Sequence, residues 1–289
     1  MAEPVRACYI VDDFPACPIY QTRQWGQAFG FEIPDRQYSR GWELMTKMPV
    51  YPVADTEWFA DFVEEFGIRG KFTVLGYPAG RGRLDESVRG YSDEELKRLL
   101  DIVRDRIAPR FDITPEVLTH TMACDPDTLQ MRPHCESHWL SHLAAEGRVD
   151  ELTAYIHKAY TILRNVGLRA HGITIGGMPD LSGIAGDKPL TRGHHRDVLA
   201  EALARVEREL GLSGEMTFMF TGSPAITDAG RRLRAPELIH TTGDGVKAYD
   251  VHAITDPVWF LMHGIGDIDA LIDRFISRDL SHGELVDDA

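Results

Sequence analysis

A short apolar run that ends on two adjacent carboxylates is the feature that most constrains how this chain can fold. Cys8–Val11 has the pattern of a buried strand, Asp12 and Asp13 follow it directly, and Phe14-Pro15 then turns the chain. Because parallel sheets of α/β proteins carry their chemistry at the carboxyl ends of the strands, we expect both acids at the rim of a sheet. Neighbouring carboxylates repel unless a cation lies between them or one stays protonated. A solvated turn without function is the alternative interpretation.

Strand and helix patterns alternate along the chain, which is typical of βαβ units around a parallel sheet. Further strands are predicted at 71–76, 115–121, 170–176 and 216–221, with candidates at 236–239 and 246–254. Helices are predicted from Asp55 to Gly67, behind the capping box that starts at Ser92, and at 139–143, 152–163, 196–210 and 268–276. We therefore predict an α/β fold: one domain over residues 1–289, a single β/α barrel, distorted or seven-stranded, with a mostly parallel sheet and outer helices. Long loop insertions are expected at about 14–52 and 121–138.

Composition limits the partners that the chain can have. The chain has 289 residues, is 43% hydrophobic and has a net charge of −14, so we expect no nucleic acid and no anionic membrane among its partners. The first residues lack a long apolar region, and no run approaches the roughly 18 apolar residues of a membrane span. The four cysteines form no CxxC pair, which favours reduced thiols in the cytoplasm. A homo-oligomer remains open.

Histidines supply the second group of candidate residues. His120 ends the predicted third strand, so a parallel barrel would bring it to the same rim as the two acids. His134 and His138 are four residues apart, as are His138 and His142, and such pairs on a helical turn share one face and can hold one cation. A structural strand-end histidine and a polar helix face are the alternative interpretations.

Imidazole and carboxylate ligands together favour a divalent metal, zinc first and other first-row metals next. One carboxylate would bind the ion, and its neighbour could take a proton from water. Cys124 and Asp125 follow His120 closely and could also be ligands. The chain has no GxSxG elbow, no Walker-type phosphate loop and no GxGxxG after a strand.

The order of these features resembles the polysaccharide deacetylase family, carbohydrate esterase family 4, and its β/α-barrel relatives. The residues that carry the resemblance lie between Tyr9 and Thr174: Ile10–Asp13 as the strand-Asp-Asp motif, Gly70–Gly76 as the second strand, Glu116–Thr121 before the histidine motif, and Asn165–Leu168 as a helix exit. The resemblance implies that Asp12 is the catalytic base and Asp13 a metal ligand, with His120, His134 and His138 completing the metal site. His252 would be an acid, because Asp250–His252 loosely resembles a later Leu-x-His motif.

The chain also departs from the family pattern. Phe14-Pro15 follows the acids where the family commonly has Gly, and Cys124 stands at the place of the second motif histidine. The Arg-x-Pro motif of the family is missing near Ile173–Gly176. These departures affect the metal set and the reaction more than the fold.

Three functions follow as hypotheses. The first is a metal-dependent hydrolase that removes an acyl group, by cleaving an amide or ester bond, from a small or carbohydrate-type substrate. The second is a metal-independent glycosidase that uses Asp12 with Glu136 or Asp250 as its carboxylate pair. The third is a non-catalytic carbohydrate-binding protein with a degenerate site, which the missing Arg-x-Pro motif favours.

Overall fold

The computed structural model describes residues 9–15, 50–120, 122–175, 192–212, 214–220 and 236–251. The strands are β1 (Tyr9–Phe14), β2 (Gly70–Val74), β3 (Phe111–Pro115), β4 (Met122–Cys124), β5 (Met131–Cys135), β6 (Ile173–Thr174), β7 (Met216–Phe220), β8 (Glu237–Thr241) and β9 (Lys247–Asp250). The helices are α3 (Val53–Phe66), α4 (Asp93–Ile102), α5 (Glu136–Ala145), α6 (Val149–Asn165) and α7 (Arg192–Glu209), with the shorter η1 (Pro78–Gly80) and η2 (Val103–Ile107).

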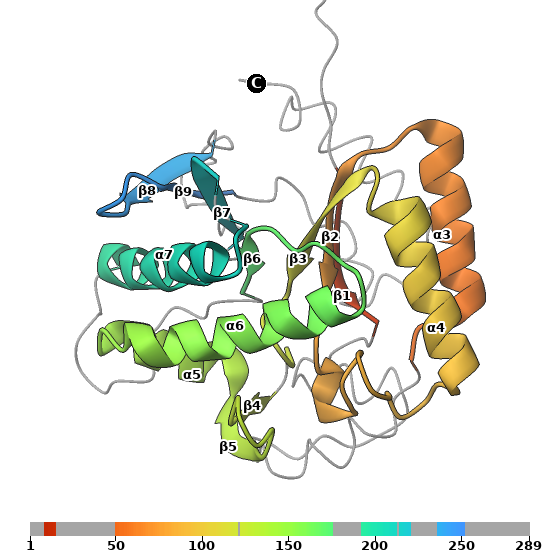
Figure 1. Cartoon of the computed structure of the whole chain (residues 1–289), viewed down its shortest axis with the longest axis horizontal. Helices are drawn as coiled ribbons and strands as arrows, with labels where there is room; N and C mark the ends of the chain where they lie inside the picture. Colours follow the sequence, from red (N-terminus) through yellow and green to blue (C-terminus); the bar gives the residue numbers. More distant parts are fainter. Residues whose placement is uncertain are drawn as a thin grey trace, which may run out of the picture.

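Most strands lie in one row, in the order β1, β2, β3, β6, β7, β9, β8 (Figure 1). β1, β2 and β3 pair in parallel, as do β6, β7 and β9, and a parallel bridge between Ile113 and Ala170 connects the two groups. β8 pairs antiparallel with β9. The predicted α/β class with a mostly parallel sheet is confirmed. Within the described ranges β1 and β8 do not pair with each other, so this row of strands forms no closed barrel.

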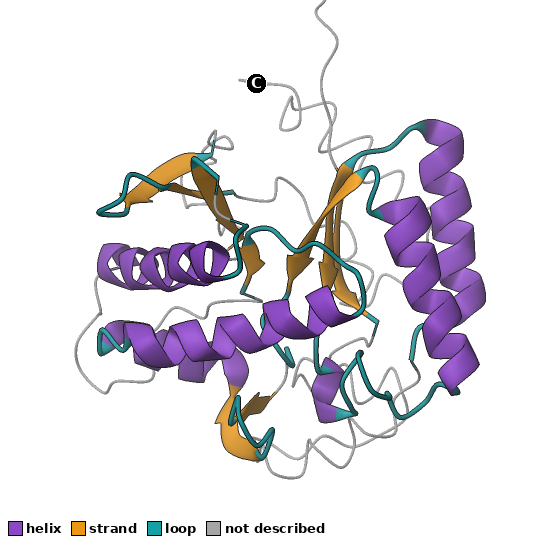
Figure 2. Cartoon of the chain, in the orientation of Figure 1, coloured by secondary structure: helices purple, strands orange, loops and turns teal. Residues whose placement is uncertain are grey.

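The two faces of β1–β3 differ because side chains alternate along each strand. One face carries Phe72 and Phe111, and the ring of Phe59 in α3 packs on both with centroids 5.9 Å away. Burying the rings of Phe72 and Phe111 stabilises the fold by about 1.5–3 kcal/mol each. α3 and α4 stand side by side along this part of the sheet (Figure 2). The same alternation turns Lys71 and Thr73 to the opposite face, where they are 4% and 0% exposed.

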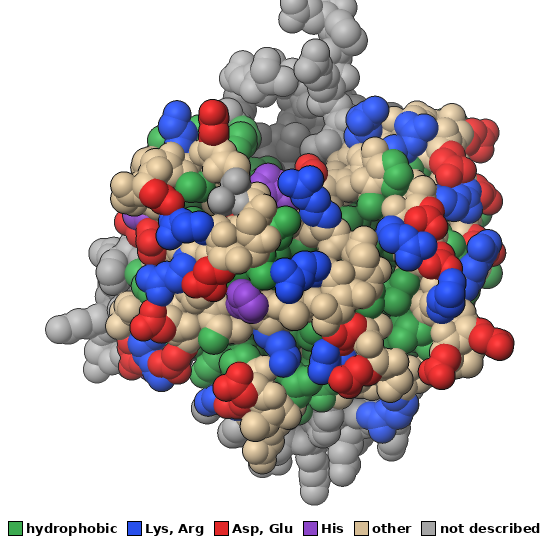
Figure 3. Space-filling model, in the orientation of Figure 1, with side chains coloured by type: hydrophobic (Ala, Val, Ile, Leu, Met, Phe, Trp, Pro, Cys, Tyr) green, Lys and Arg blue, Asp and Glu red, His purple; other side chains and the backbone are tan. Residues whose placement is uncertain are grey.

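Helix α4 forms as its capping pattern predicts. The Ser92 Oγ accepts a hydrogen bond from the Glu95 N–H at 3.2 Å, and the Ser92 N–H donates to the Glu95 carboxylate at 2.8 Å. On the outer surface, Arg98 pairs with Glu57 of α3 at 2.6 Å, and acidic and basic side chains are interspersed over this side of the molecule (Figure 3). Solvent screens such pairs, so apolar contacts do most to hold these helices in place. None of the described helices is long and apolar enough to cross a membrane.

Several predicted boundaries are wrong. The third strand is Phe111–Pro115 rather than 115–121, because its alternating residues pair with β2 and the chain then leaves the sheet. The segment 121–138, predicted as a loop insertion, contains the antiparallel hairpin of β4 and β5 and the first turn of α5. Helix α3 begins at Val53, two residues before Asp55, and its N-cap Pro52 makes no side-chain capping bond. The loop predicted at 14–52 and the helix at 268–276 lie largely or wholly outside the described residues.

Candidate functional site

The strand that carries the two acids has an irregularity at the acids themselves. β1 extends from Tyr9 to Phe14, so it continues through Asp12 and Asp13 rather than ending before them. Val11 pairs with Phe72, and Phe14 pairs with Val74. An advance of three residues along β1 is therefore matched by an advance of only two residues along β2. This is the count of a one-residue β-bulge, which breaks the strict alternation of a strand and re-aims its side chains. Asp12, two residues after the Lys71 partner Ile10, lies on the Lys71 face by ordinary alternation, and the extra residue brings Phe14 to the opposite face, where its ring packs on that of Phe72.

Asp12 is held by a buried lysine from the neighbouring strand. The Nζ of Lys71 donates to Asp12 Oδ1 at 2.7 Å and to Thr174 Oγ1 at 2.8 Å, and it lies 4.1 Å from the centre of the Phe220 ring. The lysine side chain is 5% exposed, whereas that of Asp12 is 45% exposed. Three different partners thus satisfy the buried ammonium, and the carboxylate remains accessible to solvent.

A second polar pair lies beside the first. Glu116, which follows β3 and is 1% exposed, accepts a hydrogen bond at its Oε2 from the Thr73 hydroxyl at 2.6 Å. Its Oε1 lies 3.6 Å from Nδ1 of His120, whose side chain is 5% exposed. That distance is too long for a hydrogen bond, and the contact is an ion pair only when the imidazole is protonated. The His120 side chain is therefore buried beside a carboxyl group, but this contact with Glu116 is longer than the hydrogen bond that orients a metal-binding histidine.

The charges of Lys71, Glu116 and His120 influence the protonation of Asp12. Partial burial, and then the negative charge of Glu116, raise the pKa of Asp12 above its ordinary value. The nearby charges of Lys71 and His120 act in the opposite direction. A carboxylate with a raised pKa and a held geometry is suited to accept a proton near neutral pH.

Glu136, the first residue of α5, lies behind His120. Its carboxylate accepts hydrogen bonds from the backbone N–H groups of Leu118, Thr119 and His120 and from the Tyr155 hydroxyl. Burial raises the pKa of Glu136, while the bonds from Tyr155 and the backbone favour the ionised form. Every one of these contacts uses the carboxylate as an acceptor, so Glu136 is committed to holding the backbone. This disfavours Glu136 as half of a glycosidase pair.

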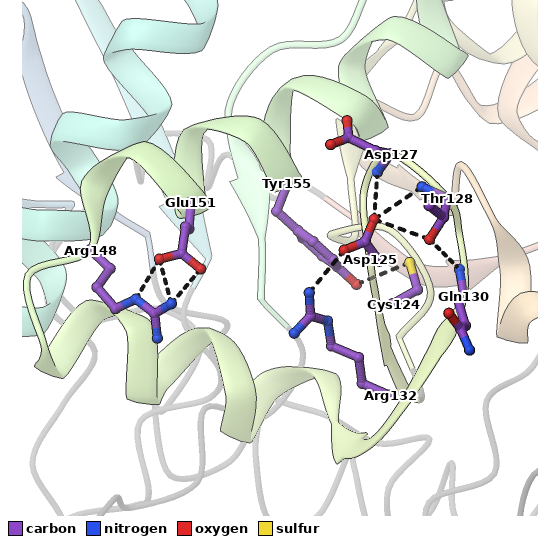
Figure 4. A network of polar contacts seen from close by, with 9 residues as sticks. All are labelled: Cys124, Asp125, Asp127, Thr128, Gln130, Arg132, Arg148, Glu151 and Tyr155. Atoms are coloured by element: carbon purple, nitrogen blue, oxygen red, sulfur yellow. Dashed lines mark hydrogen bonds and ion pairs between the residues drawn. The ribbon is translucent and has the colours of Figure 1, made fainter.

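The β4–β5 hairpin accounts for the two other residues considered as ligands. Asp125 accepts bonds from the backbone of Asp127 and Thr128 and from Arg132, which closes the hairpin turn (Figure 4). Cys124 is fully buried with its sulfur 3.8 Å from the Tyr155 hydroxyl, and burial raises its pKa to about 12. The thiolate that a metal requires is thus disfavoured at Cys124, and Asp125 is used by the turn.

Only part of the predicted metal set can be placed. Of the four proposed ligands, His120 alone has a described side chain, while those of Asp13, His134 and His138 lie outside the described part, as does all of His252. The expectation that His134 and His138 share one helical turn is wrong, since His134 lies in β5 and α5 begins at Glu136. No set of three or more His, Cys, Asp or Glu side chains suited to a metal occurs among the residues described. The joint metal site stays a prediction.

Sequence reasoning missed Lys71, Thr73, Glu116 and Thr174 as members of this cluster. A lysine at the start of a predicted buried strand is a signal that could have been recognised, because lysine is almost never fully buried without a partner. Lys71 and Thr73 also alternate with the aromatic face of β2. Thr174 could not have been found, since only the sheet order brings it to Lys71.

Comparison of the chain with protein-family models, with curated proteins and with solved structures found no match. The resemblance to polysaccharide deacetylases accordingly rests on the motifs of the sequence alone.

Proposed function

We propose that this chain is a metal-dependent hydrolase of the deacetylase type, which removes an acyl group from a small carbohydrate-type substrate on a β/α-barrel-like scaffold. The observation that carries the proposal is the pairing of Asp12 with the buried Lys71 beside the Glu116–His120 pair. Asp12 lies in the second half of β1, Lys71 is the second residue of β2, and Glu116 and His120 follow the end of β3. Asp12, Glu116 and His120 thus lie toward the carboxyl ends of neighbouring parallel strands. That is where α/β enzymes place their reaction centres.

Asp12 is assigned the role of base. Lys71 holds Oδ1, so Oδ2 is the oxygen that would take a proton from the attacking water, and the 45% exposure of the side chain leaves room for it. The ammonium of Lys71 would keep Asp12 oriented and favour its ionised form, as a base requires. Proton transfer and positioning of this kind each contribute substantial rate enhancement without new covalent chemistry.

The described histidine fits a metal-binding role. Glu116 lies 3.6 Å from Nδ1 of His120, and a shortening of this contact to a hydrogen bond would fix the ring and strengthen the other nitrogen as a ligand. Asp13, His134 and His138 would be the further ligands. A zinc ion bound there would polarise the acyl carbonyl and make water more acidic.

The glycosidase hypothesis receives less support. Glu136 is engaged by three amides and a hydroxyl, and Asp250 is fully buried in an ion pair with Arg196 at 3.1 Å. Neither carboxylate combines exposure with a raised pKa in the way that Asp12 does.

Metal content and acyl release test the proposal together. Protein purified without chelator is analysed for bound metals, and acetate release is measured on a panel of N-acetylated and O-acetylated mono- and disaccharides. We expect about one divalent ion per chain, loss of acetate release on treatment with chelator, and recovery when zinc is added back. Acetate release that persists in metal-free protein would contradict the metal role, and absence of both metal and release would favour a binding protein.

A further inference from the structure

The segment between β3 and β4 has an unusual backbone conformation. Its Val117 N–H donates to the Thr174 carbonyl at 3.0 Å, and its Leu118 and Thr119 carbonyls accept from the N–H groups of Tyr77 and Ala79 at 2.8 and 3.1 Å. Val117 and His120 adopt φ values of 46° and 58°, in the left-handed region. This conformation is costly for a residue other than glycine, and for a β-branched residue it is an outlier. Such conformations persist where the surroundings impose them, and they gather at functional sites.

The side chain of Glu136 binds the amides of this segment up to His120. Oε1 accepts from the N–H of Leu118 at 3.2 Å and of Thr119 at 2.8 Å, and Oε2 accepts from the N–H of His120 at 2.5 Å. Three successive amides thus converge on one buried anion, an arrangement that needs the chain to curl around it. The Tyr155 hydroxyl donates to the same Oε1 at 2.5 Å and fixes the carboxylate from α6.

We propose that Glu136 is a positioning residue: by binding the His120 amide, it sets the left-handed turn that holds the His120 ring against Glu116. The importance of this contact for catalysis rests on the proposed function, but the coupling between Glu136 and His120 does not. His120 lies 16 residues before Glu136 in the sequence, and the hairpin of β4 and β5 brings the two together. The β4–β5 hairpin, which lies in a predicted loop insertion, therefore brings Glu136 to the backbone of His120.

The substitution Glu136→Gln tests the contact with little change in shape. With its amide oxygen at the Oε1 position, the glutamine keeps the bonds from Leu118, Thr119 and Tyr155. Its NH₂ group then faces the His120 N–H, so two donors oppose each other at the one contact that the proposal requires. The reverse orientation would lose three bonds to keep one. Tyr155→Phe is the matched control, because it removes one buried bond to the same carboxylate and leaves all three amide bonds in place.

The readout is the ring of His120 in long-range ¹H–¹⁵N spectra at one fixed pH, with the resonance assigned by its loss in His120→Gln. We expect Glu136→Gln to move the Nδ1 resonance in the same direction as Glu116→Gln, and the double variant to add no further movement. The His120 amide should exchange with solvent roughly tenfold faster or more. Tyr155→Phe should lower the urea midpoint and leave the ring resonance where it is in the wild type.

Several outcomes would overturn the proposal. One is a Glu136→Gln variant of lowered stability whose His120 ring stays at its wild-type resonance. Another is an equal movement in Tyr155→Phe, which would indicate general loosening. Should Glu136→Gln not fold, Glu136→Asp retains the charge and withdraws the carboxylate by one methylene, and it must give the same displacement of His120. If His120 moves as expected while Asp12→Asn turns over substrate normally, the positioning role stands and the proposed function fails.

Discussion

The Asp12–Lys71 pair joins an accessible carboxylate to a buried ammonium. Lys71 is directed at Asp12, Thr174 and the Phe220 ring at once, so it is ordered before any substrate arrives. A preorganised charge of this kind acts without further reorganisation during a reaction. Its direct effect is on the protonation of Asp12, where it opposes the effects of burial and of Glu116.

Removing the lysine charge should move the pH dependence of turnover. Lys71 lowers the pKa of Asp12, so Lys71→Met should raise that pKa, and a base works only above its pKa. We expect the acid limb of the kcat/KM profile to shift toward higher pH by about 1–3 units. Lys71→Arg, which retains the charge, should shift it much less. An acid limb that is unchanged in Lys71→Met would contradict an electrostatic role for the lysine.

Cys124 offers a prediction that needs no substrate. Burial raises its pKa to about 12, so very little thiolate is present at pH 8. Because the thiolate is the reactive form, we expect native Cys124 to react with iodoacetamide at least about 10³-fold more slowly than an ordinary cysteine. Peptide-level mass spectrometry resolves this residue from the other cysteines. Rapid labelling in the native protein, equal to that in urea, would show that the thiol is neither buried nor protonated.

At the scale of elements, the approach of β6 to β7 depends on one glycine. Gly172 has a φ of 68°, its N–H donates to the buried Glu207 carboxylate at 2.9 Å, and its carbonyl accepts from the Tyr160 hydroxyl at 2.5 Å. A Cβ at this position would lie 2.4 Å from the ring of Phe218 in β7. The turn into β6 therefore has no room for a side chain.

Gly172→Ala should destabilise the fold by about 2–5 kcal/mol, from the left-handed backbone together with overpacking. Gly211→Ala is the control, since Gly211 has the same φ of 68° and no atom lies within 4 Å of its added Cβ. That change should cost only about 1–2 kcal/mol. Urea unfolding of both variants measures the two losses of stability. Equal losses would show that the Phe218 ring moves aside at little cost.

Local signals in the sequence predicted the elements better than their edges. The capping box at Ser92 and the stop at Gly67 are both present, because each depends on residues only a few positions away. The third strand was placed too late, since the apolar run after Pro115 looked like a strand while the true one alternates from Phe111. The amide of the left-handed His120 is bound by Glu136, 16 residues later, and no local pattern reveals such a partner.

At the scale of the whole molecule, the site is assembled from segments far apart in the chain. Asp12 and Lys71 are 59 positions apart, and Lys71 and Thr174 are 103 apart. The sequence predicted that Asp12 and His120 lie at the same rim of the sheet, because the carboxyl ends of parallel strands meet there. It did not indicate Lys71 or Glu116 as their partners, since those contacts depend on which strands are neighbours in the sheet.

The bulge also bears on the different roles proposed for Asp12, the base, and Asp13, a metal ligand. In a regular strand Asp12 and Asp13 would face opposite sides, and a base could not lie beside a ligand. An extra residue at this point removes that restriction. The proposed function therefore assigns different roles to two neighbouring side chains of identical chemistry, and the roles can be separated by substitution.

The most direct test compares Asp12→Asn with Asp13→Asn for zinc content and acetate release, measured side by side on the acetylated sugar that the wild type cleaves best. Asp12→Asn should keep the fold and the ion and lower turnover by about 10²–10⁴-fold, because it removes the base without changing the size of the side chain. Asp13→Asn should instead lower zinc occupancy. Full turnover in Asp12→Asn, or equal loss of zinc in both variants, would contradict the role assigned to Asp12.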